Sequence, residues 1–175
     1  MNRLLAFALL SICLALTACG GTGGADTAAP AATDTTAATT AAPAPTGDIS
    51  TDLSEKPVPQ VPDAPADKLE VKDIVEGNGP AATKGDTLSV QYVGVAQSNG
   101  QEFDSSWSRG AQPFEFQLGA GMVIPGWDQG LEGMKAGGRR QLTIPGDLAY
   151  GPAGQPPSIG PDETLVFVVD LESIK

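Results

Sequence analysis

Apolar residues between about residue 69 and the C-terminus follow two different spacings. Most alternate with polar residues, as in strands that bury one face, and these segments are residues 69–75, 87–92, 114–117, 141–144 and 165–171. In one segment Trp127, Leu131 and Met134 repeat at intervals of four and three, which predicts a short helix that ends at Gly137. The pattern therefore predicts an α+β fold in which an antiparallel sheet wraps on one short helix.

The first residues of the chain have the features of an export signal. Arg3 precedes a mostly apolar run at residues 4–16, which is shorter than the about 20 residues of a spanning helix but suits a signal peptide. Residues 16–20, LTACG, resemble the lipobox of bacterial lipoproteins. This resemblance implies that residues 1–18 are a lipoprotein signal peptide and that Cys19 is lipidated. An ordinary secretory cleavage site that happens to carry a Cys is the alternative.

Between this junction and the alternating segments the composition predicts a linker. From residue 20 to residue 47 the chain contains only Gly, Ala, Thr and Pro, apart from Asp26 and Asp34. Such a segment has little apolar surface to offset the entropy of ordering its backbone, and the closely spaced prolines of residues 57–65 favour an extended lead into the domain. We therefore expect a lipidated Cys and disordered linker over residues 19–66 and one folded domain over residues 67–175.

Charge and residue types exclude several classes of function. The net charge of −11 disfavours nucleic acid as a partner. The chain has no His, which removes the usual general base and the commonest metal ligand, so neither a metal nor a cofactor is predicted. Its two cysteines, Cys13 and Cys19, both lie near the N-terminus and form no disulfide framework. At this point a non-catalytic binding module is as consistent with the sequence as an enzyme.

Seven segments of the predicted domain together resemble FKBP-type peptidyl-prolyl isomerases, in the same order and at nearly the same spacing. They are VQYVG (90–94), FDSS (103–106), PFEFQLG (113–119), VIPGW (123–127), LTIP (142–145), AYG (149–151) and LVF (165–167). The resemblance implies a twisted antiparallel β-sheet half wrapped around one short α-helix, with the active site between them. It also implies an enzyme that accelerates rotation about X-Pro bonds and assists the folding of exported proteins.

The resemblance also implies a set of site residues. The catalytic residues would be Asp104, Tyr150, Trp127 and Phe103, and the substrate-binding residues would be Tyr92, Phe114, Val123, Ile124, Ile159 and Phe167. Trp127 would form the floor of the pocket, while Asp104 and Tyr150 supply polar groups near the twisting amide. Core packing is an equal alternative for Phe103, Phe116 and Phe167. Arg109 either orients Asp104 or is a solvated loop residue, and Trp107 is expected at the surface or in a loop.

The expected partners follow from these assignments. They are proline-containing unfolded or partly folded polypeptides, together with a membrane that is reached through the lipid anchor. The protein is expected in the cell envelope, on the outer side of the cytoplasmic membrane or on the outer membrane, and as a monomer. Gln155 and Ser158 depart from the family's loop over the site, so we expect macrolide binding to be weak. A non-catalytic chaperone or ligand-binding module with the same fold is the alternative function.

Overall fold

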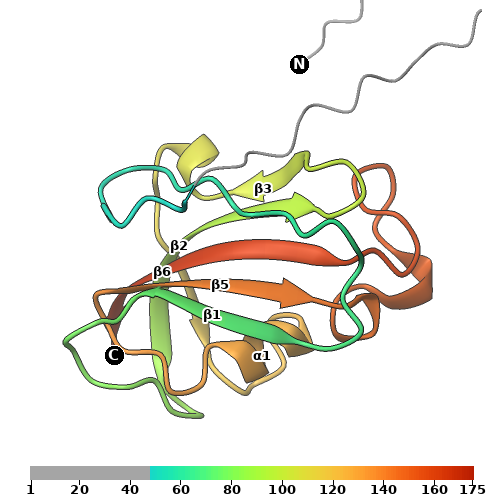
Figure 1. The fold of residues 1–175 in the computed structure, drawn as a ribbon. Coiled ribbons are helices and arrows are strands. Elements are labelled where there is room, and N and C mark those ends of the chain that lie inside the picture. Colours follow the sequence, from blue (N-terminus) through green and yellow to red (C-terminus); the bar gives the residue numbers. More distant parts are fainter. Residues whose placement is uncertain (1–47) are drawn as a thin grey trace, which may run out of the picture. The chain divides into compact units, whose positions relative to one another are not determined.

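The structure is a computed structural model that describes residues 48–175. The predicted signal peptide, Cys19 and most of the predicted linker lie outside these residues. The described part contains six strands, one α-helix and three 3₁₀ turns (Figure 1). They are β1 (Glu70–Val75), β2 (Thr87–Ala96), β3 (Glu102–Ser105), η1 (Trp107–Arg109), β4 (Phe114–Gln117), α1 (Pro125–Gly130), β5 (Gly138–Ile144), η2 (Gly146–Leu148), η3 (Gly151–Ala153) and β6 (Leu165–Ile174). Among residues 48–175 no helix has the length and apolar character needed to cross a membrane.

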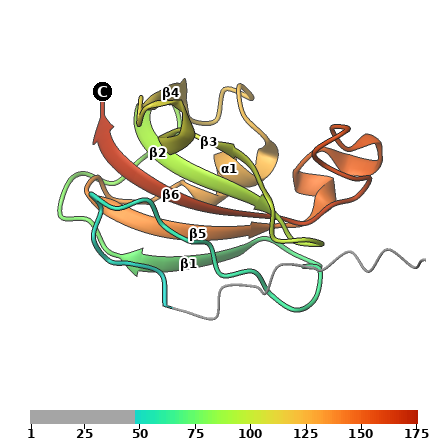
Figure 2. The same cartoon turned by 90° about the horizontal axis from the view of Figure 1, so that it is seen from above.

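The strands form one antiparallel sheet in the order β1-β5-β6-β2-β3, and β4 pairs with one end of β2. The long strands β2 and β6 pair along most of their lengths, from Leu88 opposite Ile174 to Ala96 opposite Leu165. The twisted sheet curves around α1, which lies against one of its faces (Figure 2). The predicted fold class is confirmed, and every strand predicted from alternation is present. The structure adds β3, a short strand on the edge of the sheet.

The helix is shorter than its apolar spacing predicts. It begins at Pro125 and ends at Gly130, although Met134 is still buried in the core. Gly133 has a φ of +76°, a conformation that glycine adopts readily and that ends a helix. Its N–H donates to the carbonyl of Ala82, outside the helix, at 2.8 Å. The spacing therefore predicted burial correctly, but the last part of the predicted helix is a turn.

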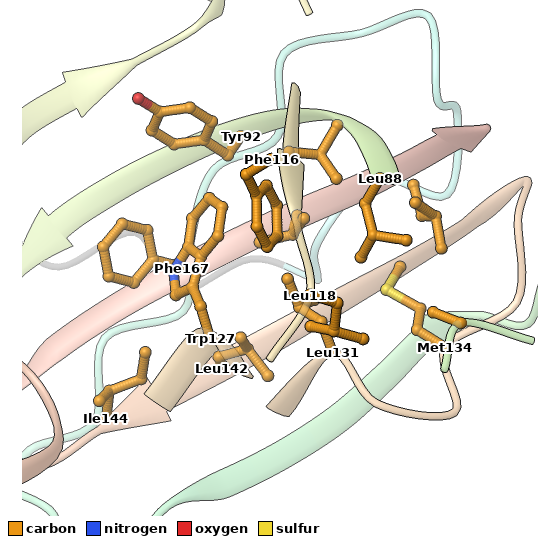
Figure 3. Close-up of a cluster of buried hydrophobic side chains, with 14 of the residues drawn as sticks. Leu88, Tyr92, Phe116, Leu118, Trp127, Leu131, Met134, Leu142, Ile144 and Phe167 are labelled. Atoms are coloured by element: carbon orange, nitrogen blue, oxygen red, sulfur yellow. The ribbon is translucent and has the colours of Figure 1, made fainter. Parts of the chain in front are cut away.

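The main core lies between α1 and the inner face of the sheet, which is the face that α1 covers. Its side chains come from β2, β4, β5, β6, α1 and the segments that directly follow β4 and α1. They include Leu88, Tyr92, Phe116, Leu118, Trp127, Leu131, Met134, Leu142, Ile144 and Phe167 (Figure 3). Phe116 is buried there, beside Trp127 with a ring separation of 5.6 Å. Phe116 is therefore a core residue, and the pocket described below is not lined by it.

Residues 48–66, which we call the arm, lie against the outer face of the sheet. Figure 2 shows the arm and α1 on opposite faces. The side chain of Ile49 is only 5% exposed, Pro57 and Pro59 are buried, and Val61 packs against an apolar cluster of Val93, Val95 and Val166. The structure differs here from the predicted boundary at residue 67, because this part of the predicted linker belongs to the folded domain.

Hydrogen bonds from the sheet to the backbone of the arm explain the difference. Arg139 is fully buried on the outer face of β5, where its guanidinium donates to the carbonyls of Ser50 at 2.5 Å and Glu55 at 2.9 Å. The same guanidinium forms two bonds with Asp170, at 2.5 and 2.7 Å. The side-chain amide of Gln141 bonds both the N–H and the carbonyl of Gln60. Because these partners contact the backbone of the arm, its side-chain composition gives no sign of them.

Trp107 also lies on the outer face. It begins η1 and is partly buried against the same cluster of valines that Val61 contacts. The expectation of a surface or loop residue is met, because Trp107 lies in the connection between β3 and β4 and is only partly buried. Its indole in addition covers apolar surface that β2 and β6 would otherwise expose. The indole N–H is buried and has no hydrogen-bond partner among the residues that the structure describes.

Candidate active site

A cavity of about 550 Å³ opens between the inner face of the sheet and α1. Its lining residues come from β2, β3, β4, α1, β6 and the loops beside them. They are Tyr92, Phe103, Asp104, Arg109, Phe114, Met122, Val123, Ile124, Trp127, Tyr150 and Phe167. Every site residue predicted from the sequence lines this cavity except Ile159. Ile159 is buried and lines an adjoining cavity of about 280 Å³ with Phe103, Asp104 and Tyr150.

Aromatic rings pack around Trp127 at the base of the cavity. Trp127 is the third residue of α1 and lies in its first turn. Pro125 starts this turn, at the first helical position, where proline is favoured. Its indole lies edge-on to Tyr92 at 5.2 Å and to Phe167 at 5.3 Å between ring centroids. Such edge-to-face pairs contribute about 0.5–1.5 kcal/mol beyond the area that they bury. The floor of the cavity is therefore a mutually supported aromatic cluster (Figure 3).

Gly94 on β2 leaves room for the two phenylalanines of the pocket wall. A Cβ at this position would approach the ring of Phe167 at 2.6 Å and the ring of Phe103 at 2.8 Å. Both distances are shorter than van der Waals contact, so any side chain here would displace at least one ring. With glycine present, the rings of Phe103 and Phe167 pack edge to face at 5.5 Å.

The polar side of the cavity is a network of Asp104, Tyr92 and Arg109. The Tyr92 hydroxyl donates to Asp104 Oδ2 at 2.5 Å, and the backbone N–H of Ser105 donates to Asp104 Oδ1 at 2.8 Å. Arg109 forms an ion pair with Asp104 and donates to the Tyr92 hydroxyl at 2.7 Å. Its guanidinium also lies 5.5 Å from the centroid of the Tyr92 ring. The structure therefore decides the open question for Arg109, which orients Asp104.

The environment of the cavity raises the pKa of both of its tyrosines, whose hydroxyls are protonated at neutral pH even at their ordinary pKa. Burial raises the pKa of Tyr92 to about 12, and the hydrogen bond to Asp104 acts in the same direction. Burial also raises the pKa of Tyr150, with a smaller contribution from the charge of Asp104. The two hydroxyl groups therefore remain hydrogen-bond donors over the whole physiological range.

The mouth of the cavity is bordered by exposed apolar side chains. Met122 is 66% exposed, and Phe114 and Tyr150 are each 38% exposed. The residues predicted from the sequence did not include Met122, although its position directly before the predicted substrate-binding residues Val123 and Ile124 was a signal that could have found it. An apolar mouth leading to an aromatic floor suits an apolar ring such as that of proline, and the network of Asp104 offers polar groups at one side.

Comparisons with known proteins agree with this geometry. The family described as FKBP-type peptidyl-prolyl cis-trans isomerase matches residues 79–172. A FK506-binding protein of Streptomyces anulatus is 58% identical over 123 residues, which cover 69% of this chain and 98% of that protein. A probable FK506-binding protein of Corynebacterium glutamicum is 48% identical over 120 residues, covering 68% of this chain and 98% of that protein.

The crystal structure of AtFKBP13 is similar in fold as well. It has a TM-score of 0.57 and 40% sequence identity, over 61% of this chain and 93% of that one. The chain therefore belongs to the family of FKBP-type peptidyl-prolyl cis-trans isomerases and is an enzyme of that class. The match to the Streptomyces protein is longer than residues 67–175, so it reaches into the arm.

Proposed function

We propose that this isomerase acts on X-Pro bonds of unfolded or partly folded exported polypeptides, and that it holds the proline ring on Trp127. The observation that carries the proposal is the single cavity in which Trp127, Tyr92, Phe167 and Phe103 meet the polar network of Asp104. The cavity provides a small apolar site with a few polar groups at one side, which is the usual composition of a site for a small apolar ligand.

The chemistry requires no proton transfer. Rotation about an X-Pro amide must cross a barrier of about 18–20 kcal/mol because twisting removes the resonance of the amide. The planar amide is the more polar form, so water stabilises it more than the twisted transition state. The aromatic lining excludes this water and holds the proline ring while the preceding residue rotates.

The polar network then acts on the twisted amide. Asp104, oriented by Arg109 and Tyr92, places a carboxylate beside the site, and the Tyr150 hydroxyl lines the same cavity. A rate enhancement of about 10⁴–10⁵ corresponds to about 5.5–7 kcal/mol, which desolvation and two or three preorganised polar contacts can supply. The catalytic roles of Asp104, Tyr150, Trp127 and Phe103 are part of this proposal.

A protease-coupled isomerisation assay with a proline tetrapeptide tests the proposal. We expect catalysis by the domain that starts at Asp48 and its loss in Trp127→Ala, provided that denaturant titration shows the variant to be folded. The alternative, a non-catalytic chaperone or binding module, predicts no acceleration for the tetrapeptide but suppressed aggregation of a denatured protein. That result with folded wild-type domain would contradict the proposal.

We further propose that Cys19 carries the lipid anchor, which holds the enzyme in the cell envelope. The support is the sequence LTACG at residues 16–20, which resembles a lipobox. Several acyl chains bind a membrane far more firmly than one, since each buried CH₂ contributes about 0.8 kcal/mol.

Gln155 and Ser158 line the cavity that adjoins the main one, and we propose that they make binding of FK506-like macrolides weak. We also propose a monomer.

A further inference from the structure

Two neighbouring arginines of β5 lie on opposite faces of the sheet. Arg139 contacts the arm on the outer face. Arg140 pairs with Val169 in the sheet, on the same inner face as Leu142 and Ile144. Its side chain is only 10% exposed. A charged side chain so nearly enclosed in the core face needs partners for its N–H groups, because burying an unpaired charge is costly.

The partners of Arg140 are β1 and the end of the helix. Its guanidinium bonds both carboxylate oxygens of Asp73, at 2.5 and 3.1 Å. Its Nη1 donates to the carbonyl of Gly130 at 2.8 Å and to that of Glu132 at 3.4 Å. Gly130 is the last residue of α1, where helix carbonyls lack partners within the helix and the helix dipole favours a positive charge. Arg140 thus joins the C-terminal end of α1 to β1.

The rest of α1 rests on the same strand through two glycines. A Cβ on Gly126 would approach Ile144 at 2.4 Å, and a Cβ on Gly130 would approach Leu142 at 2.7 Å. The helix backbone is therefore pressed against Ile144 and Leu142, and the next inward residue of β5 is Arg140. These contacts set the distance between α1 and the sheet, while the hydrogen bond from Arg140 adds a directional contact at the C-terminal end. A helix of six residues has few hydrogen bonds of its own to resist displacement.

Trp127 lies between the two contact glycines on this short helix. We propose that Arg140 is a positioning residue for the isomerisation: by holding the carbonyl end of α1 it sets the height of Trp127 in the floor of the pocket. The inference rests on the proposed role of Trp127 as that floor. Arg140 does not line the cavity, so it acts on the reaction only through the helix. The planar fork of arginine bonds Asp73 and the helix end together, whereas lysine has no such fork.

Arg139 provides a matched control. We would make Arg140→Met and Arg139→Met in a Trp107→Phe background, so that all tryptophan fluorescence comes from Trp127, the only other Trp of the chain. Both changes remove a largely buried guanidinium from β5. Arg139→Met also leaves Asp170 buried without its arginine, so it is expected to destabilise the fold at least as much. Activity and fluorescence are compared at a temperature at which urea titration shows each variant to be folded.

For Arg140→Met we expect kcat/KM for a proline tetrapeptide to fall about tenfold or more, because small displacements at a reacting site have large effects on rate. The emission of Trp127 should shift and become easier to quench with acrylamide. Arg139→Met should match the Trp107→Phe parent in both measurements. Arg140→Lys keeps the charge and most of the stem and should show the same changes at smaller size. If Arg140→Met does not fold, Arg140→Lys is used to test the positioning role. If Arg139→Met does not fold, Arg139→Lys serves as the control.

Several results would overturn the inference. The first is that the folded Arg140 variant has a kcat/KM within about twofold of that of the Trp107→Phe parent, whether or not the emission of Trp127 changes. A second is a loss of activity with unchanged emission, and a third is an equal loss in the Arg139 control. If the parent itself is inactive, the proposed function is contradicted, and unchanged Trp127 emission in the Arg140 variant then contradicts the positioning role separately.

Discussion

Removing the arm should destabilise the domain without changing its active site. The test compares a chain that starts at Asp48 with one that starts at Asp67. The first keeps all contacts between the arm and the sheet, and the second lacks them. The arm covers Val93, Val95 and Val166 through Val61. It also supplies carbonyl partners to Arg139 and two hydrogen bonds to Gln141.

The expected loss in the free energy of unfolding comes mainly from uncovering the apolar cluster of valines. Fully burying a valine stabilises a fold by about 1.5–3 kcal/mol, so uncovering all three completely would cost about 4.5–9 kcal/mol. Trp107 continues to cover part of the cluster, and water replaces the carbonyls at Arg139. We therefore expect a net loss of about 2–3 kcal/mol, a large part of the about 5–15 kcal/mol by which domains are stable. In urea the midpoint should fall by about 1 M or more.

Two point variants separate the parts of this effect. Ile49→Ala, in the chain that starts at Asp48, truncates one of the buried side chains of the arm and should cost about 2 kcal/mol, near the lower end for such changes. Lys56→Ala removes an exposed ion pair with Glu102 at 2.7 Å and should change stability by less than about 1 kcal/mol. kcat/KM should be unaffected in all folded variants, because the pocket is on the opposite face. Equal urea midpoints for the two truncated chains would refute the reasoning.

Four further predictions concern the site, the stability of the fold and the anchor. Asp104→Asn should lower kcat/KM about five- to thirtyfold, the equivalent of about 1–2 kcal/mol. Folded Phe167→Ala should lower kcat/KM at least as much. A loss above about 10³-fold for Asp104→Asn alone would indicate proton transfer or covalent catalysis. Activity should be nearly constant from about pH 6 to 9, and a bell-shaped profile near pH 7 would contradict the mechanism. Because the folded-state pKa of Tyr92 is raised to about 12 from 10.0, its contribution to stability should be complete below pH 10 and be lost as the pH rises through about 12, measured by urea titration. Cys19→Ala should move the full-length protein out of the membrane fraction or leave it as precursor, whereas finding the wild type wholly soluble would contradict lipidation.

Features that depend on the local spacing of residues could be predicted from the sequence. Alternating residues predicted the strands because a strand presents successive side chains to opposite faces. The ordered segments that carry Asp104, Trp127 and Tyr150 predicted the family, which the comparisons confirm. They also predicted which residues would line one cavity, and only Ile159 lies outside it. The catalytic roles of these residues stay predictions.

Features that depend on contacts between distant segments became visible only in the folded chain. Arg109 could be assigned to Asp104 only after η1 had been placed beside β2 and β3. The residues after α1 form a turn in which the N–H of Gly133 donates to the carbonyl of Ala82, far away in the chain. The arm is the part of the described chain whose structure was hardest to predict from its sequence. The composition of the arm indicates that ordering its backbone has a high entropic cost. The groups that offset this cost, Arg139 and Gln141, lie on a strand more than 70 residues later. They bind carbonyl and N–H groups that every sequence possesses, so only the fold could reveal that these residues are ordered.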